Sequence, residues 1–283
     1  MEHSPLWLII NAASGSYSAA ALADLLATME ASGCAPERVI RLPEDDLPTG
    51  MALAASGVRT LAVFTGDGTI NSAATRAEGW DGALLVLPGG TMNLLSKSLH
   101  GDVPVHAIID HLGTANHRRI SRPAVRTSQG TALVEVLAGP GAMWADVREG
   151  VRDFDLGAIA ETFTNALRET REGPGVTIAD CATAKPDGYR ALRIAPEDEG
   201  LRAEGYDFTD LADFAAQGFA ILVKRDFRQG PHDDLGHFAA IDCHSTGPIP
   251  LMIDGERRQG EAAERFKRIM FPVDFITTKP GGD

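Results

Sequence analysis

The chain has 283 residues, of which 44% are hydrophobic and 23% charged, the composition of a globular protein with room for one large or two ordinary domains. Lys and Arg number 26 against 39 Asp and Glu, and the net charge of −13 argues against nucleic acid as a partner. No apolar stretch approaches the roughly 18 residues that span a bilayer, and no basic segment precedes the first apolar run, so neither a membrane-spanning helix nor a signal peptide is expected. The cysteines are odd in number and far apart, which favours a reducing, cytoplasmic compartment over a disulfide framework.

The first 122 residues alternate apolar runs of strand length with helical segments. Ser18 can cap a helix that ends at Gly33, because a serine oxygen accepts from an unpaired amide and glycine tolerates a left-handed exit. This alternation predicts a doubly wound parallel sheet, an α/β domain in which ligands bind at the carboxyl ends of the strands. The predicted strands are 6–10, 38–42, 60–65 and 83–87, and the predicted helices are 18–30, 51–56, one that starts at 70, and 92–99.

The pattern changes near residue 122. Short alternating segments follow, separated by Gln-Gly, Asp-Gly, Glu-Gly and Gly-Pro turns, and this favours antiparallel β structure in a second domain. One segment, 153–171, has apolar residues at helical spacing. The predicted strands are 131–137, 191–194, 218–223, 238–243 and 250–253.

Two glycine-rich loops follow neighbouring predicted strands. Residues 65–71 read Thr-Gly-Asp-Gly-Thr-Ile-Asn, and residues 88–93 read Pro-Gly-Gly-Thr-Met-Asn. Both lead into helices, so unpaired amides and a positive helix end can face an anion, while glycine lets phosphate oxygens approach the backbone. Thr69 and Thr91 can add hydroxyl donors. One such loop is equally well explained as a tight turn, but two on neighbouring strands favour phosphate binding.

Other phosphate motifs do not fit. There is no P-loop pattern, and Asn71 stands where a dinucleotide-binding fingerprint has its third glycine. Asp67 lies between two phosphate-binding glycines and would repel phosphate unless a cation screens it or it accepts a proton. It therefore points to Mg²⁺ or base chemistry, both of which belong to phosphoryl transfer.

Four segments in this order, 11–15, 66–71, 87–93 and 254–256, resemble motifs of the diacylglycerol kinase catalytic family of lipid kinases. That family includes bacterial diacylglycerol kinases, sphingosine kinases and ceramide kinases. The resemblance covers nearly the whole chain, although residues 140–235 agree only in general character. It implies a nucleotide-binding domain of residues 1–122 that is completed by about 265–283, a β-sandwich lipid-substrate domain of residues 123–264, and an active site in the cleft between them.

The resemblance also implies ATP and Mg²⁺ and assigns roles to residues. Glu256 is the first choice for the base that deprotonates the lipid hydroxyl, as in the bacterial members, and Asp67 is the rival, as in sphingosine kinases. Asp254 joins them as a catalytic residue, and Asp67 and Asp254 are the candidate Mg²⁺ ligands, although Asp254-Gly255 alone more often means a hairpin turn. The nucleotide-binding residues would be Asn11, Ser14, Gly15, Thr65, Gly66, Asp67, Gly68, Thr69, Asn71, Gly89, Gly90, Thr91 and Asn93.

Several positions depart from the family pattern. Thr65 replaces a glycine, Ser72 replaces a glutamate, and Leu94 replaces an acid. The threonine expected near the end of the second strand is replaced by the segment Arg41-Leu42-Pro43. These changes leave the phosphate-binding glycines in place and alter the surroundings of the adenine and the metal.

The function expected is an ATP- and Mg²⁺-dependent lipid kinase that phosphorylates a primary hydroxyl of diacylglycerol, ceramide or a sphingoid base. As a cytoplasmic protein it would contact the inner face of the membrane transiently to reach this lipid partner, and a homodimer is left open. Two alternatives also stay open. One is a soluble-substrate kinase similar to NAD kinases, which share the Gly-Asp-Gly-Thr loop, and the other is a non-catalytic nucleotide-binding regulator.

Overall fold

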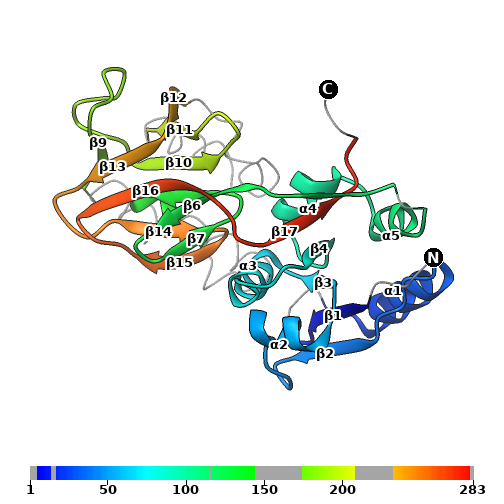
Figure 1. The fold of residues 1–283 in the computed structure, drawn as a ribbon. Coiled ribbons are helices and arrows are strands. Elements are labelled where there is room, and N and C mark those ends of the chain that lie inside the picture. The colour runs from blue at the N-terminus through cyan, green and yellow to red at the C-terminus, as the bar shows by residue number, and fades with distance from the viewer. Residues whose placement is uncertain (1–4, 14–16, 115, 144–173, 208–231, 281–283) are drawn as a thin grey trace. The chain divides into compact units, whose positions relative to one another are not determined.

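The computed structural model describes residues 5–13, 17–114, 116–143, 174–207 and 232–280 (Figure 1). The chain divides into two compact units, one formed by Met1–Arg122 with Met270–Asp283 and the other by Pro123–Ile269. The sequence prediction placed the same boundary after residue 122 and started the returning segment slightly earlier, near 265. The predicted fold class is confirmed, because the first unit contains a largely parallel sheet with helices and the second contains antiparallel sheets.

The first unit is built on a six-stranded sheet in the order β2-β1-β3-β4-β17-β5. Neighbouring strands are parallel except β5, which runs antiparallel to β17. The strands are β1 (Leu6–Asn11), β2 (Arg38–Leu42), β3 (Thr60–Thr65), β4 (Ala83–Pro88), β5 (Arg118–Ile120) and β17 (Asp274–Thr277). The helices are α1 (Ala19–Ala31), α2 (Gly50–Ser56), α3 (Asp67–Arg76), α4 (Leu94–His100) and α5 (Val105–Gly113).

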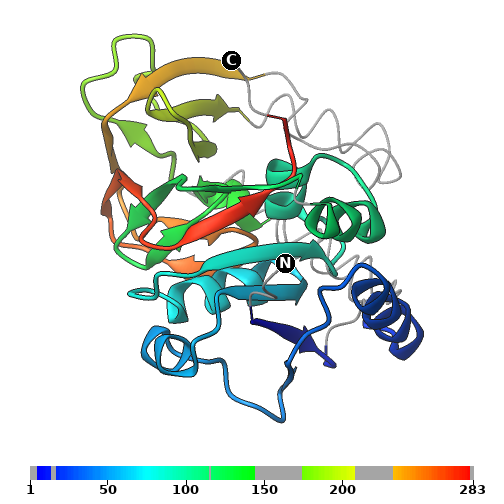
Figure 2. The same cartoon turned by 45° about the vertical axis from the view of Figure 1, so that its right-hand side comes forward.

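Helices α1 and α5 lie side by side and cover one face of this sheet (Figures 1 and 2). Leu25 of α1 and Ile109 of α5 belong to one buried cluster with alternate residues of β1, among them Leu8 and Ile10. Because side chains alternate along a strand, Ile9 and Asn11 point to the opposite face. Helix α3 contacts β3, and β1 pairs directly with β3.

Two helices differ from the sequence prediction. Helix α3 begins at Asp67, three residues before the predicted start, because Gly66 takes the extended N-cap conformation and the Gly-Asp-Gly-Thr segment forms the first helical turn. Glycine signals a break inside a helix, but a first turn has few intrahelical bonds to lose. Helix α5 was not predicted at all, although Ile108 and Ile109 are fully buried.

The second unit contains two sheets, in the orders β12-β11-β10-β8-β14-β15 and β7-β6-β16-β13-β9. Two predicted strands are each divided in the structure: 131–137 forms β7 and β8, and 238–243 spans the end of β12 and most of β13. The predicted strand 218–223 and helix 153–171 lie outside the described residues. The elements are β6 (Pro123–Thr127), β7 (Gly130–Ala132), β8 (Val136–Ala138), η1 (Pro140–Met143), β9 (Thr177–Ile178), β10 (Ala191–Pro196), β11 (Leu201–Tyr206), β12 (Asp233–Phe238), β13 (Ala240–His244), β14 (Pro250–Ile253), β15 (Glu256–Gln259) and β16 (Ala263–Met270).

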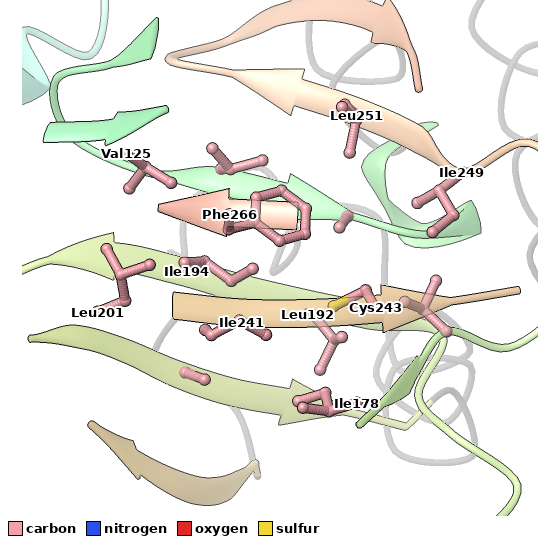
Figure 3. Close-up of a cluster of buried hydrophobic side chains, with 14 of the residues drawn as sticks. Val125, Ile178, Leu192, Ile194, Leu201, Ile241, Cys243, Ile249, Leu251 and Phe266 are labelled. Carbon is pink, nitrogen blue, oxygen red and sulfur yellow. The ribbon is translucent and has the colours of Figure 1, made fainter. Parts of the chain in front are cut away.

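The core of the second unit lies between its two sheets (Figure 3). Phe266 of β16 and Ile241 of β13 come from one sheet, and Leu192 and Ile194 of β10 come from the other. All four are essentially inaccessible to solvent. Burial of such apolar side chains stabilises a fold by about 1.5–3 kcal/mol each, so this interior is the main source of stability of the second unit.

Among the described residues, no helix is long and apolar enough to cross a membrane. Cys34, Cys181 and Cys243 are all free thiols, and burial raises the pKa of Cys34 and of Cys243 above the ordinary range.

Candidate functional site

Three adjacent strands of the first unit end at the same edge of the sheet. Strand β1 ends at Asn11, β3 at Thr65 and β4 at Pro88, and Thr65 is directly paired with Pro88. Because these strands are parallel neighbours, the segments that follow them are brought together at this edge. These segments are the three that the sequence analysis assigned to phosphate binding.

Asn11 connects the first two segments. Its Nδ2 donates a hydrogen bond to Oγ1 of Thr69 at 3.2 Å, and its Oδ1 accepts one from the amide of Ala13 at 3.0 Å. One side chain thus fixes the turn after β1 and joins it to the first turn of α3. Ser14 and Gly15, the other nucleotide-binding residues predicted in this turn, lie outside the described residues.

The Gly-Asp-Gly-Thr segment forms the amino-terminal turn of α3. Gly66 is the N-cap with φ −78° and ψ 163°, and its carbonyl accepts the first intrahelical bond from the amide of Ile70 at 3.1 Å. The amides of residues 67–69 therefore precede the regular bonding pattern of the helix. Such a turn presents donors and the positive end of the helix dipole, which is a favourable place for an anion.

The second glycine loop is held by its own asparagine. Asn93 has left-handed backbone angles, φ 53° and ψ 41°, which asparagine tolerates better than most residues. Its Oδ1 accepts from the Gly90 amide at 2.8 Å, and its Nδ2 donates to the Gly90 carbonyl at 3.0 Å. The loop is therefore closed on itself just before α4 begins.

The two glycine loops touch each other. A Cβ added to Gly90 would lie 2.7 Å from the Cα of Gly66, and one added to Gly89 would lie 2.6 Å from the backbone of Phe64 and Thr65. No side chain other than hydrogen fits at these two positions. The close approach is reinforced by Asp67, whose Oδ1 accepts from the amide of Leu95 in the first turn of α4 at 3.3 Å.

The remaining predicted nucleotide residues divide into two groups. Thr65 is only 1% exposed, and its hydroxyl donates to the Gly66 carbonyl. Thr91 is exposed, and Gly68, Thr69 and Asn71 are half-buried near the first turn of α3. The sequence analysis did not foresee the Leu95 amide, because a backbone donor leaves no signal in residue type.

The Asp254-Gly255 pair forms a hairpin turn in the second unit. Ile253 pairs with Glu256, so these two residues are the whole turn between β14 and β15. Both have positive φ, 47° and 91°, which is the pattern of a two-residue type I′ turn. Asp254-Gly255 is therefore a hairpin turn, the more common structure of an Asp-Gly pair.

The Asp254 side chain turns inward. Its carboxylate is buried and accepts hydrogen bonds from the amides of Leu133 at 2.6 Å, Val134 at 2.9 Å and Glu135 at 3.0 Å. These bonds fasten the hairpin to the connection between β7 and β8. A carboxylate occupied by three amides has little capacity left to ligate a metal or accept a substrate proton, so the geometry favours a positioning role over the predicted magnesium and catalytic roles.

Glu256, two residues later, faces solvent. Its side chain is 53% exposed, and its Oε2 lies 3.8 Å from Nη1 of Arg258 on the same strand. An exposed pair at this distance contributes little to stability. Glu256 therefore keeps the accessibility that its predicted role as a base requires.

The two predicted magnesium ligands differ in how well they suit the ion. Mg²⁺ is usually held by one or two carboxylates together with substrate phosphates and water. Asp67, at the amino-terminal turn of α3 beside the phosphate-binding segments, fits this description, whereas Asp254 does not. Among the described residues there is no group of three or more His, Cys, Asp or Glu side chains arranged to hold a metal without a phosphate.

One charged cluster in the second unit was not foreseen. Arg193 of β10 binds Glu135 at 2.7 Å and Glu204 of β11 at 3.0 Å, and Tyr206 donates to Glu204 at 2.9 Å. Burial raises the pKa of Glu204, but the hydrogen bonds from Arg193 and Tyr206 outweigh it and leave that pKa below its usual value. Burial, and then Glu204, raise the pKa of Tyr206. Arg193 lies on β10, Glu204 and Tyr206 lie on β11, and Glu135 precedes β8, so spacing in the sequence gave no sign of this cluster.

Comparison with known proteins agrees with the motifs. Residues 5–122 match the family model of the diacylglycerol kinase catalytic domain, which confirms the expected resemblance for this part of the chain. A crystal structure named as a diacylglycerol kinase from Bacillus anthracis strain Sterne is 14% identical, with 97% of each chain covered and a TM-score of 0.60. A second structure from that organism, provisionally named a diacylglycerol kinase, is 15% identical, with 98% of each chain covered and a TM-score of 0.62. At this identity the structures show a shared fold, and no protein of curated function matches the chain.

Proposed function

We propose that the protein, whose residues 5–122 match the family model of the diacylglycerol kinase catalytic domain, transfers the γ-phosphate of ATP to a primary hydroxyl of a membrane lipid. The observation that carries the proposal is the contact between the two glycine loops, in which Gly90 meets Gly66 and Asp67 bonds to the first turn of α4. Two helix amino termini are thereby joined at one edge of the sheet. This arrangement supports the binding of a polyphosphate.

The residues of the first unit would act mainly by placing and stabilising charge. Phosphoryl transfer needs little covalent participation from the protein, so positioning and electrostatic stabilisation supply most of the catalysis. The amides of residues 67–69 would bind phosphate oxygens, and the Thr69 hydroxyl would add a donor. Mg²⁺, when bound beside Asp67, would neutralise charge on the phosphates.

Glu256 is the proposed base. Its carboxylate is exposed, whereas one oxygen of Asp67 already accepts from the Leu95 amide. A carboxylate is a far weaker base than an alkoxide, so it removes little of the proton of an alcohol before transfer begins. Glu256 would therefore orient the acceptor hydroxyl and take its proton late in the reaction. In this scheme Asp254 holds the hairpin from which Glu256 extends.

The acceptor is proposed to be diacylglycerol, ceramide or a sphingoid base. The protein would meet such a lipid by transient contact with the inner face of the membrane. Its net charge of −13 means that attraction to anionic lipid must come from local groups. Arg257 and Arg258, both exposed on β15 next to Glu256, are groups of this kind.

The test is phosphate transfer from radiolabelled ATP in mixed micelles with Mg²⁺, with diacylglycerol, ceramide, sphingosine and NAD as separate acceptors. Wild-type protein is compared with Glu256→Gln and Asp67→Asn, and with Glu261→Gln as a matched control, because Glu261 is an exposed carboxylate of the same unit. We expect a labelled lipid, a loss of at least about 100-fold in Glu256→Gln, and ordinary activity in Glu261→Gln.

Other outcomes would replace the proposal with one of the two alternatives. A labelled NAD product with no labelled lipid would identify a soluble-substrate kinase. ATP binding without transfer to any acceptor would identify a nucleotide-binding regulator. Full activity in Glu256→Gln with loss in Asp67→Asn would move the role of base to Asp67.

A further inference from the structure

We infer that Asn11 is a positioning residue that directs the hydroxyl proton of Thr69 toward a phosphate oxygen of the bound nucleotide. This inference rests on the proposed function, because it assumes that a nucleotide polyphosphate binds at the amino terminus of α3. It assigns to Asn11 an indirect role, exerted through Thr69, that differs from a direct contact with the nucleotide.

The position of Asn11 follows from the alternation of β1. Ile9 and Asn11 share the face of the sheet opposite to the α1 and α5 cluster, since Leu8 and Ile10 belong to that cluster. Strand β1 pairs directly with β3, whose end leads into α3. A side chain at the last residue of β1 on this face is therefore within reach of the first turn of α3.

The orientation of the Asn11 amide group is determined by its partners. The amide of Ala13 can only donate a hydrogen bond, so the atom of Asn11 that faces it at 3.0 Å must be the oxygen. The nitrogen must then face Thr69 Oγ1, at 3.2 Å, as the donor. A reversed amide would place two donors together at Ala13 and is excluded on that ground.

The state of Asn11 restricts what the Thr69 hydroxyl can do. A hydroxyl has one proton to donate, and the bond from Asn11 occupies an accepting position on Oγ1. Within the described part of the chain, the Thr69 hydroxyl has no acceptor for its own proton. Thr69 lies in the turn whose amides precede the bonding pattern of α3, so an anion bound to that turn would be a suitable acceptor.

The experiment is a double-mutant cycle on nucleotide affinity, measured by calorimetry with ATP and, separately, with adenosine. Asn11→Ser keeps an oxygen that can accept from the Ala13 amide but is too short to reach Thr69. Thr69→Val removes the hydroxyl and keeps the branched shape, and Thr69→Ser keeps the hydroxyl as a matched control. The four variants, including the double variant Asn11→Ser with Thr69→Val, are also compared by thermal unfolding.

We expect Thr69→Val to weaken ATP binding about tenfold, because a hydrogen bond to a charged phosphate is lost. Asn11→Ser should weaken it about threefold to tenfold, and the double variant should bind ATP as Thr69→Val does. Thr69→Ser should bind ATP within about threefold of wild type. Adenosine, which has no phosphate, should bind all variants equally.

Additive losses in the double variant, or equal losses for ATP and adenosine, would overturn the inference, because Asn11 would then act independently of the Thr69 hydroxyl. If Asn11→Ser unfolds, the cycle is repeated with Asn11→Ala under the same criteria. Failure of the wild-type protein to bind ATP would instead overturn the proposed function itself, and the inference with it. The two failures are therefore distinguished by the wild-type measurement.

Discussion

The dipeptide Asp-Gly occurs once at each candidate site and adopts a different structure in each unit. In the first unit Asp67-Gly68 begins helix α3, and Asp67 accepts one amide at the edge of the sheet. In the second unit Asp254-Gly255 forms a hairpin turn, and the Asp254 carboxylate is buried beneath three amides. The two pairs are identical in residue type, so the difference comes from the element that each pair leads into: a helix in the first unit and a second strand in the other.

The largest effect expected from this comparison is on stability. Asp254→Ala should lower the free energy of unfolding by about 3–5 kcal/mol, because three amide donors lose a buried anionic acceptor. Asp67→Ala should cost about 1 kcal/mol, since Asp67 is half-exposed and the bond that its carboxylate accepts from the Leu95 amide is long, at 3.3 Å. Denaturant unfolding measures both. Asp254→Asn keeps one oxygen and tolerates the left-handed backbone, so its loss of stability should lie between those of the two alanine variants. Equal losses for Asp254→Ala and Asp67→Ala would contradict the comparison.

The first unit should lose stability in acid. His100, at the end of α4, is 5% exposed, and burial lowers its pKa from 6.5 to about 4, with its Nδ1 within 3.0 Å of the Thr278 hydroxyl. The neutral ring is therefore the folded form. Its contribution is complete above pH 6.5 and is lost as the pH falls from 6.5 to 4, by up to about 3 kcal/mol.

The measurement is the free energy of unfolding between pH 7 and pH 4. His100→Leu, which cannot take up a proton, should have a flatter profile than wild type over this window. A wild-type profile that stays level, or a variant profile with the same slope, would show that His100 does not cause the dependence.

A smaller effect is expected where the glycine loops meet. Gly90→Ala should cost about 1–3 kcal/mol and weaken ATP binding about tenfold, because the added carbon would lie 2.7 Å from the Cα of Gly66 and push the loops apart. Gly66→Ala is the matched control for stability, since a Cβ there meets nothing within 4 Å. Thermal unfolding measures the stability of the variants, and calorimetry measures their affinity for ATP. Equal stability of Gly90→Ala and Gly66→Ala would argue against a tight contact between the loops.

The smallest effect on stability is expected at Glu256. Glu256→Gln should change the free energy of unfolding by about 0.5 kcal/mol or less, because the side chain is exposed and its only described ion pair spans 3.8 Å. Its activity should nevertheless fall sharply if Glu256 is the base. Glu256→Gln should therefore reduce activity without reducing stability, whereas Asp254→Ala should reduce the stability of the same hairpin. A large loss of stability in Glu256→Gln would contradict this division of roles.

Sequence alone predicted the elements whose apolar pattern is strong. Strands β2, β3 and β14 have the predicted limits, and β3 and β14 are short, mostly apolar runs. The capping role of Ser18 is also found, with its side chain accepting from the Ala21 amide. The predicted start of α3 was wrong because residues 66–69 were assigned to a glycine-rich loop, whereas Gly66 is the N-cap and residues 67–69 form the first turn of the helix.

Residue types in the sequence pointed to a candidate site but not to the contacts within it. The glycine loops were identified from residue types, and residues 5–122 match the expected family. The inward turn of Asp254 could not be predicted, because its partners at residues 133–135 are far away in the sequence and donate through the backbone. Contacts of this kind depend on the tertiary fold, which residue spacing does not encode.

The position of β17 has a consequence for synthesis of the protein. This strand, Asp274–Thr277, pairs with β4 on one side and β5 on the other, although both neighbours precede residue 123. During translation, β4 and β5 therefore cannot be joined through β17 until the second unit has been synthesised. Unpaired strand edges promote aggregation. Strand β17 thus completes a sheet whose other five strands all precede residue 123.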